Sequence, residues 1–110
     1  MLIAVLCAGE QIPARAGEAD ALLLVETENA AVAAAYPRGD GGVLRLAEIA
    51  AGSGAEAVCC GMIEDEALFE ILASAGVTRC FAPGMTAVEA ARACEIGTLP
   101  LIVRPGVLHG

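Results

Sequence analysis

The sequence predicts a layered α/β domain, and three observations support this class. The chain has 110 residues, which is the length of one ordinary domain. Hydrophobic residues make up 57% of the chain and charged residues 18%, a balance that excludes intrinsic disorder. After Gly42, apolar runs of strand length alternate with stretches of helical periodicity, and such strand-helix-strand units require parallel neighbouring strands.

The amino-terminal part predicts three strands. Residues 2–7 form a continuous apolar run, as expected of a central strand covered on both faces. Residues 8–20 mix glycine, proline and charge, which indicates a loop. Residues 21–26 and 31–36 are two further apolar runs, and their short separation predicts an antiparallel hairpin. The glycine-rich segment at 37–42 then predicts a surface loop.

Helices and strands alternate in the next part of the chain. Residues 43–50 carry apolar side chains at helical spacing, and residues 56–60 return to strand length. The acidic residues 64–66 favour the N-terminus of a second helix, which is expected to end at Gly76. Residues 77–81 predict the next strand. The strands at 2–7, 56–60 and 77–81 are therefore expected to be mutually parallel.

A third helix and a tail complete the chain. Thr86 and Glu89 have the spacing of a capping box, and the helix they begin is expected to end at Gly97. We therefore expect a mixed sheet of five strands with about three helices over residues 1–97, and a tail at 98–110. Because residues 99–103 of the tail are apolar, we expect them either to extend an edge of the sheet or to meet a second copy of the chain in a homodimer.

The composition excludes several function classes. The net charge is −8, lysine is absent and the six arginines are scattered. No basic stripe is available to neutralise phosphates, which argues against nucleic-acid binding. No apolar run reaches the length of about 18 residues that crosses a bilayer, and the first ten residues lack the basic start of a secretory signal. We therefore expect a cytoplasmic protein without a membrane partner.

The cysteines are the residues that point to chemistry. Five of them, an odd number without a secretion signal, indicate reduced thiols. Cys7, Cys60 and Cys80 stand at the carboxyl ends of the three parallel strands, where ligands bind in open α/β sheets. Met62 and Met85 follow two of these strands. Because thiolates and thioethers select iron–sulfur clusters, zinc and cuprous copper, the sequence predicts a metal site with the three cysteines as ligands.

The remaining candidate ligands are expected to take no part. Cys59 and Cys60 point to opposite faces of one strand, and Cys60 is favoured because it is nearer to the loop. Cys94 continues the apolar stripe of the last helix, so we expect it to pack in the core. His109, the only histidine, is expected to be a solvated residue of the tail. The alternative for every cysteine is that it packs as a small hydrophobic side chain.

Four segments resemble the dinitrogenase iron-molybdenum cofactor biosynthesis family. They are LIAVLC, GEADALLLVET, GAEAVCCGMIEDEALFEILASAGV and FAPGMTAVEAARA, and with the order of elements they carry the resemblance from about residue 2 to residue 94. The resemblance implies a ribonuclease H-like three-layer fold. It also implies an accessory protein of nitrogen fixation that is not an enzyme and that binds or carries iron-molybdenum cofactor or an iron-sulfur precursor cluster. Its partners would then be proteins that donate or accept the cluster.

The chain departs from the family at one informative position. Members that carry cofactor often have His-Phe-Gly before the second strand, where this chain has Arg15, Ala16 and Gly17. A guanidinium cannot ligate a metal, but it can pair with an anionic cofactor. The site that the resemblance and the strand ends together imply consists of Arg15, Gly17, Cys7, Cys60, Gly61, Met62, Cys80 and Met85.

Two further hypotheses stay open. The chain could be a degenerate family member that has lost its cofactor and acts as a protein-interaction or regulatory module, with residues 99–103 as its contact surface. It could also be a thiol-dependent enzyme that uses Cys60 beside a helix N-terminus, although the acidic residues 64–66 oppose the thiolate that such an enzyme needs.

Overall fold

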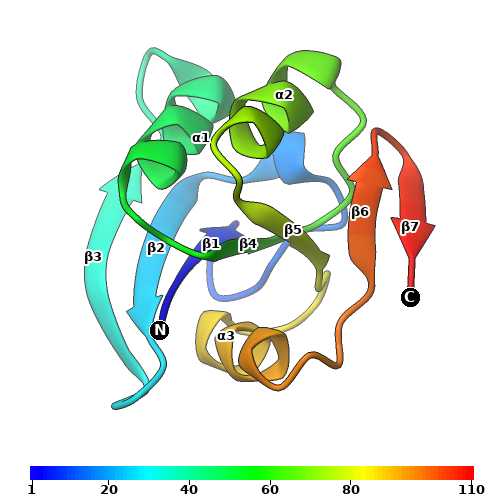
Figure 1. Cartoon of the computed structure of the whole chain (residues 1–110). Coiled ribbons are helices and arrows are strands. Elements are labelled where there is room, and N and C mark those ends of the chain that lie inside the picture. The colour runs from blue at the N-terminus through cyan, green and yellow to red at the C-terminus, as the bar shows by residue number, and fades with distance from the viewer.

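A seven-stranded mixed sheet organises the fold, and the computed structural model describes it over residues 1–110 (Figure 1). The strands are β1 (Leu2–Cys7), β2 (Ala21–Glu26), β3 (Ala31–Pro37), β4 (Ala57–Cys60), β5 (Thr78–Phe81), β6 (Leu101–Arg104) and β7 (Val107–His109). Their order in the sheet is β3-β2-β1-β4-β5-β6-β7. β4 pairs in parallel with β1 and β5, and the other neighbours are antiparallel. The predicted parallel strands and the antiparallel hairpin beside them are confirmed.

Three helices complete a three-layer domain. α1 (Gly42–Gly52) and α2 (Glu66–Ser74) cover one face of the sheet, and α3 (Ala87–Glu95) covers the other (Figure 1). The side chain of Asp65 accepts hydrogen bonds from two backbone N–H groups at the start of α2, and Thr86 forms the expected capping box with Glu89 at the start of α3. None of the three helices has the length and apolar character needed to traverse a bilayer.

The tail extends the sheet, as one of the two expectations for it proposed. β6 and β7 form a hairpin next to β5, where the backbone N–H of Phe81 donates to the carbonyl of Pro100 at 2.8 Å. Ile102 is fully buried in the core beneath α1 and α2. These two strands are the difference between the five expected and the seven present. They are short and a turn at residues 105–106 separates them, so the tail carries no long run of strand periodicity.

Each face of the sheet has its own apolar core, because successive side chains of a strand point to opposite faces. Leu6 and Val58 belong to the core beneath α1 and α2. Val5 and Cys59 belong to the core beneath α3. The α3 side of this second core is built largely from alanine, as at Ala90, and such small side chains let the helix approach the sheet closely. The face to which a strand residue points therefore decides which neighbours it can reach.

Candidate functional site

The three cysteines at the strand ends do not converge. Cys60 is fully buried in the core beneath α1 and α2, whereas Cys7 and Cys80 lie in the core beneath α3. The prediction of one site with these three residues as metal ligands is therefore wrong in its geometry. The cause is the pairing of β4 with β5, which sets Cys59 opposite Cys80 and turns Cys60 to the other face.

Burial also decides the chemistry of two of these thiols. Burial raises the pKa of Cys60 to about 12, and burial together with the Asp20 carboxylate raises the pKa of Cys7 to about 11. Both side chains are therefore neutral thiols at physiological pH, whereas the thiolate is the nucleophile and the metal ligand. The hypothesis of a thiol enzyme that uses Cys60 finds no support in these surroundings.

The loop at residues 8–20 covers the carboxyl ends of the parallel strands, where an open cleft was expected. The backbone N–H of Met62 donates to the carbonyl of Ala14, and the N–H of Ala16 donates to the carbonyl of Met62, both at 2.9 Å. Farther along the edge, Ile12 exchanges two backbone hydrogen bonds with the segment at 84–85, at 2.8 and 2.9 Å. The predicted ligand Met85 is thus held beneath this loop by its own carbonyl.

Gly61 has a steric role in this covering. A Cβ atom at this position would lie 2.2 Å from the carbonyl oxygen of Pro13 and 2.5 Å from the carbonyl carbon of Ala14, so only glycine lets the loop approach the end of β4 so closely. The residue was predicted to bind a cofactor. Its close approach to residues 13–14 explains the glycine without a ligand.

A shallow cavity of about 250 Å³ lies at this edge, and we call it the edge pocket. It brings together the predicted residues Arg15, Gly17 and Met62, but none of the cysteines lines it. The Nε of Arg15 lies 3.5 Å from Oε1 of Glu64, and both side chains are largely exposed. A carboxylate beside the guanidinium offsets the positive charge that would attract an anionic cofactor.

The side chains of Cys59, Cys80 and Cys94 form a thiol cluster beneath α3. The Sγ atoms of Cys80 and Cys94 are 3.3 Å apart, within hydrogen-bonding distance. Cys59 is the register partner of Cys80 on the adjacent strand, and its thiol donates to the carbonyl of Ala90 in α3 at 3.5 Å. Two thiols from the sheet and one from the helix thus meet at this place.

Within the thiol cluster, the pKa values of the three cysteines shift in different directions. The neighbouring thiols of Cys59 and Cys80 lower the pKa of Cys94 well below that of a free thiol. The Cys59 thiol lowers the pKa of Cys80, but the Cys94 thiol and burial outweigh this effect and raise that pKa to about 12. Interaction with the thiols of Cys80 and Cys94, together with burial, raises the pKa of Cys59. Of the three thiols, Cys94 is therefore the one whose pKa is lowered.

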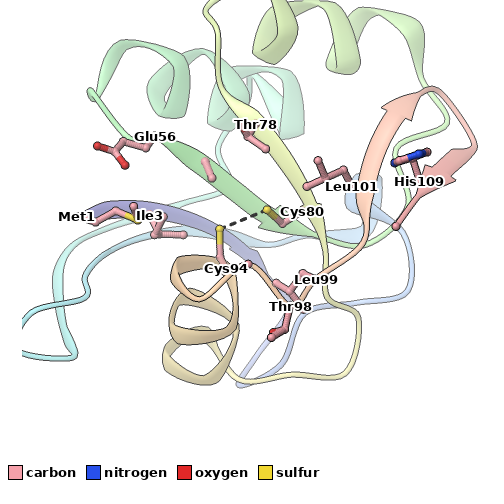
Figure 2. A pocket seen from close by; sticks show the side chains of 13 residues that line it. Met1, Ile3, Glu56, Thr78, Cys80, Cys94, Thr98, Leu99, Leu101 and His109 are labelled. Atoms are coloured by element: carbon pink, nitrogen blue, oxygen red, sulfur yellow. Dashed lines mark hydrogen bonds between the residues drawn. The ribbon is translucent and has the colours of Figure 1, made fainter.

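Cys80 and Cys94 line a second cavity of about 460 Å³, which we call the thiol pocket (Figure 2). It opens between the C-terminal end of α3 and the β6–β7 hairpin, near the amino ends of β1 and β4. Its other lining residues include Met1, Glu56, Thr78, Leu99, Leu101 and His109. Figure 2 shows Met1 and His109 at opposite sides of the thiol pair. No three side chains of cysteine, histidine, aspartate or glutamate are arranged to hold a metal ion.

Sequence reasoning placed only Cys80 of this group in a site. Cys94 was expected to be core, yet the same apolar stripe that suggested this role is what turns it toward the sheet and Cys80. Cys60 was favoured over Cys59, although Cys59 belongs to the cluster. His109, expected to be a solvated residue of the tail, is exposed and also lies at the wall of the thiol pocket. The position of His109 depends on the β6–β7 hairpin, which brings the end of the chain back to the pocket.

Comparison with known proteins identifies the fold of the chain. No family model matches the chain, and no curated protein sequence matches it. The apo form of the orange protein from Desulfovibrio gigas is similar, with a TM-score of 0.78 and 22% identity over 96% of each chain. A protein from Methanocaldococcus jannaschii, provisionally described as a dinitrogenase, has a TM-score of 0.68 and 15% identity over 96% of this chain and 97% of its own. The chain therefore has the α/β fold of these two proteins, and this agrees with the sequence resemblance at the level of architecture.

Proposed function

We propose that this protein is a non-catalytic carrier that binds a cluster of soft metal ions as cargo in the thiol pocket. The class of cargo is the one that the sequence resemblance implies, namely iron-molybdenum cofactor or an iron-sulfur precursor. The observation that carries the proposal is the contact of two cysteine sulfurs, 3.3 Å apart, at the wall of a cavity of about 460 Å³. A fold shared with the orange protein and with a protein described as a dinitrogenase supports the same class.

The electrostatics of the thiol pair suit a soft metal. Cys94 has a lowered pKa, so it is available as the thiolate, which is the form that binds metals. Soft thiolate ligands select iron-sulfur clusters and cuprous or zinc ions over hard cations. Binding would replace the hydrogen bond between the two sulfurs by bonds from each sulfur to the cargo. This replacement needs a proton to leave Cys80, so uptake is expected to weaken as the pH falls.

The size of the pocket and the number of its ligands favour a cluster over a single ion. A volume of about 460 Å³ lies in the range of small-molecule sites. Two cysteines face it, and no third side chain completes a site for one ion. The cargo would therefore keep ligands of its own, such as inorganic sulfide. Attachment through two protein ligands also suits cargo that must be released again.

The net charge of −8 limits which cargo is favoured. An anionic cluster would approach against the field of the protein, and Glu56 in the wall of the pocket adds to this opposition. Arg15, which was expected to pair with an anionic cofactor, belongs to the edge pocket and does not line the thiol pocket. The charges thus favour a neutral or cationic cluster.

Anaerobic reconstitution tests the proposal. Purified protein is incubated with ferrous iron and sulfide, desalted, and analysed for iron per chain. We expect Cys80→Ser and Cys94→Ser to lose most of the iron that the wild type retains, while the matched control Cys60→Ser, a buried thiol on the other face, retains it. A thermal melt of each variant shows that the fold persists. Absence of iron from the wild type, or equal iron in all three variants, contradicts the proposal.

A second candidate is the protein-interaction module. The β6–β7 hairpin at the edge of the sheet leaves four apolar side chains more than a third exposed: Leu101, Val103, Val107 and Leu108. Such a group on an edge hairpin is typical of a contact surface. If the wild type binds no metal and sediments as a dimer that Leu108→Glu separates, this second reading is the better one.

A further inference from the structure

We propose that Cys80 and Cys94 are a redox couple, which forms a reversible disulfide by exchange with disulfides of low molecular mass. The sulfurs are already 3.3 Å apart, and a disulfide bond is about 2.05 Å long. The two atoms therefore need to approach by roughly 1.25 Å to form that bond. Neither cysteine has another covalent partner in the chain.

The two ends of the pair differ in their freedom to move. Cys80 is buried on β5, where the hydrogen bonds of the sheet hold its backbone. Cys94 is partly exposed on the last turn of α3, which ends one residue later at Glu95 and is followed by Gly97 with a φ of +76°. Cys94 is therefore the residue that adjusts, and it is also the one that a reagent can reach.

The thiol pocket admits an oxidant to this pair and not to its neighbours. Cys80 and Cys94 line the cavity, whereas Cys59 is fully buried behind them and does not line it. The thiol of Cys59 instead donates to the carbonyl of Ala90 in α3, at 3.5 Å. This arrangement gives one accessible thiol, which attacks a disulfide once it is deprotonated, and one adjacent thiol that can complete the bridge.

The exchange balances in two steps. The Cys94 thiolate attacks one sulfur of the low-mass disulfide, so that a mixed disulfide forms and one low-mass thiolate leaves. Cys80 then loses its proton to solvent and attacks the Cys94 sulfur, which forms the Cys80–Cys94 bond and releases the second low-mass thiolate. The two protein thiols are oxidised by two electrons, and the reagent is reduced to two thiols. Excess low-mass thiol reverses both steps.

Oxidation would also control the cargo, a consequence that rests on the function proposed above. The disulfide uses both sulfurs that face the thiol pocket, so neither remains to ligate a metal. A bound cluster would then be retained only in the reduced protein. The redox couple itself does not depend on the presence of cargo.

The test uses the reduced, metal-free protein. It is incubated with excess oxidised glutathione, quenched with acid, denatured, alkylated with N-ethylmaleimide and analysed by intact mass and peptide mapping. We expect the wild type to lose two of its five alkylatable cysteines and to give one crosslinked peptide that joins Cys80 to Cys94. Cys80→Ser should stop at a mixed disulfide on Cys94, and the control Cys60→Ser should form the bridge like the wild type.

Three outcomes overturn the redox couple. They are retention of all five alkylatable thiols, a bridge that joins Cys59 in place of Cys94, and a mixed disulfide on Cys94 of the wild type that never resolves. Iron uptake is measured separately on reduced protein. A bridge without iron uptake therefore contradicts only the carrier function, and iron uptake without a bridge contradicts only the redox couple.

Discussion

Replacement of Gly61 by alanine tests the covering of the strand ends, because this glycine touches the backbone of the loop above it. The new Cβ would stand 2.2 Å from the carbonyl oxygen of Pro13, whereas non-bonded atoms prefer separations of roughly 3.5 Å, so the loop must retreat by about 1.3 Å. Such overpacking typically costs about 1–3 kcal/mol. The retreat also strains the two backbone hydrogen bonds of Met62, each of which contributes about 0.5–1.5 kcal/mol.

We therefore expect Gly61→Ala to lower the free energy of unfolding by about 4 kcal/mol, the midpoint of the sum of these two effects. The assay is equilibrium unfolding in urea, followed by circular dichroism. Gly17→Ala is the matched control, because Gly17 comes from the same predicted set and a Cβ there meets no atom within 4 Å. The control should change the stability by less than about 0.5 kcal/mol. A loss below about 1 kcal/mol for Gly61→Ala would refute the reasoning, since the loop would then yield freely.

Three further predictions concern the core and the thiols. Leu72→Ala, in the core beneath α1 and α2, should lower the free energy of unfolding by about 2–5 kcal/mol, as measured in urea. Ile96→Ala, at a side chain that is 72% exposed, should lower it little. Similar losses for the two variants would contradict the assigned core. Because its pKa is lowered, Cys94 stays a thiolate at pH values at which a free cysteine is protonated, so its rate of alkylation by iodoacetamide should be nearly constant between pH 6 and pH 8. Cys60 of the native protein, whose pKa is raised to about 12, should stay unmodified. A Cys94 rate that rises tenfold per pH unit would contradict this prediction. The Cys80–Cys94 disulfide closes a loop with a separation of 14 residues and should stabilise the oxidised protein by about 3 kcal/mol over the reduced one in urea without reductant; equal midpoints would show that strain cancels the gain.

Local signals in the sequence determined the elements of this fold and their directions. The apolar runs that ended at Cys7, Cys60 and Phe81 became β1, β4 and β5, and their separation by helices required them to be parallel. The caps at Asp65 and Thr86 marked the starts of α2 and α3. These features depend on residues close together in the chain, and that is why the sequence alone was sufficient.

Only the tertiary structure decided which thiols meet. The alternation of a strand shows that Cys59 and Cys60 face opposite ways, but it does not tell which face α3 covers or which residue of β5 stands opposite. Those facts follow from long-range pairing and from the packing of helices on the sheet. They place Cys59, Cys80 and Cys94 together and send Cys60 to the other core. Likewise, the β6–β7 hairpin and the docking of residues 8–20 rest on backbone contacts between segments far apart in the chain, for which no local periodicity exists.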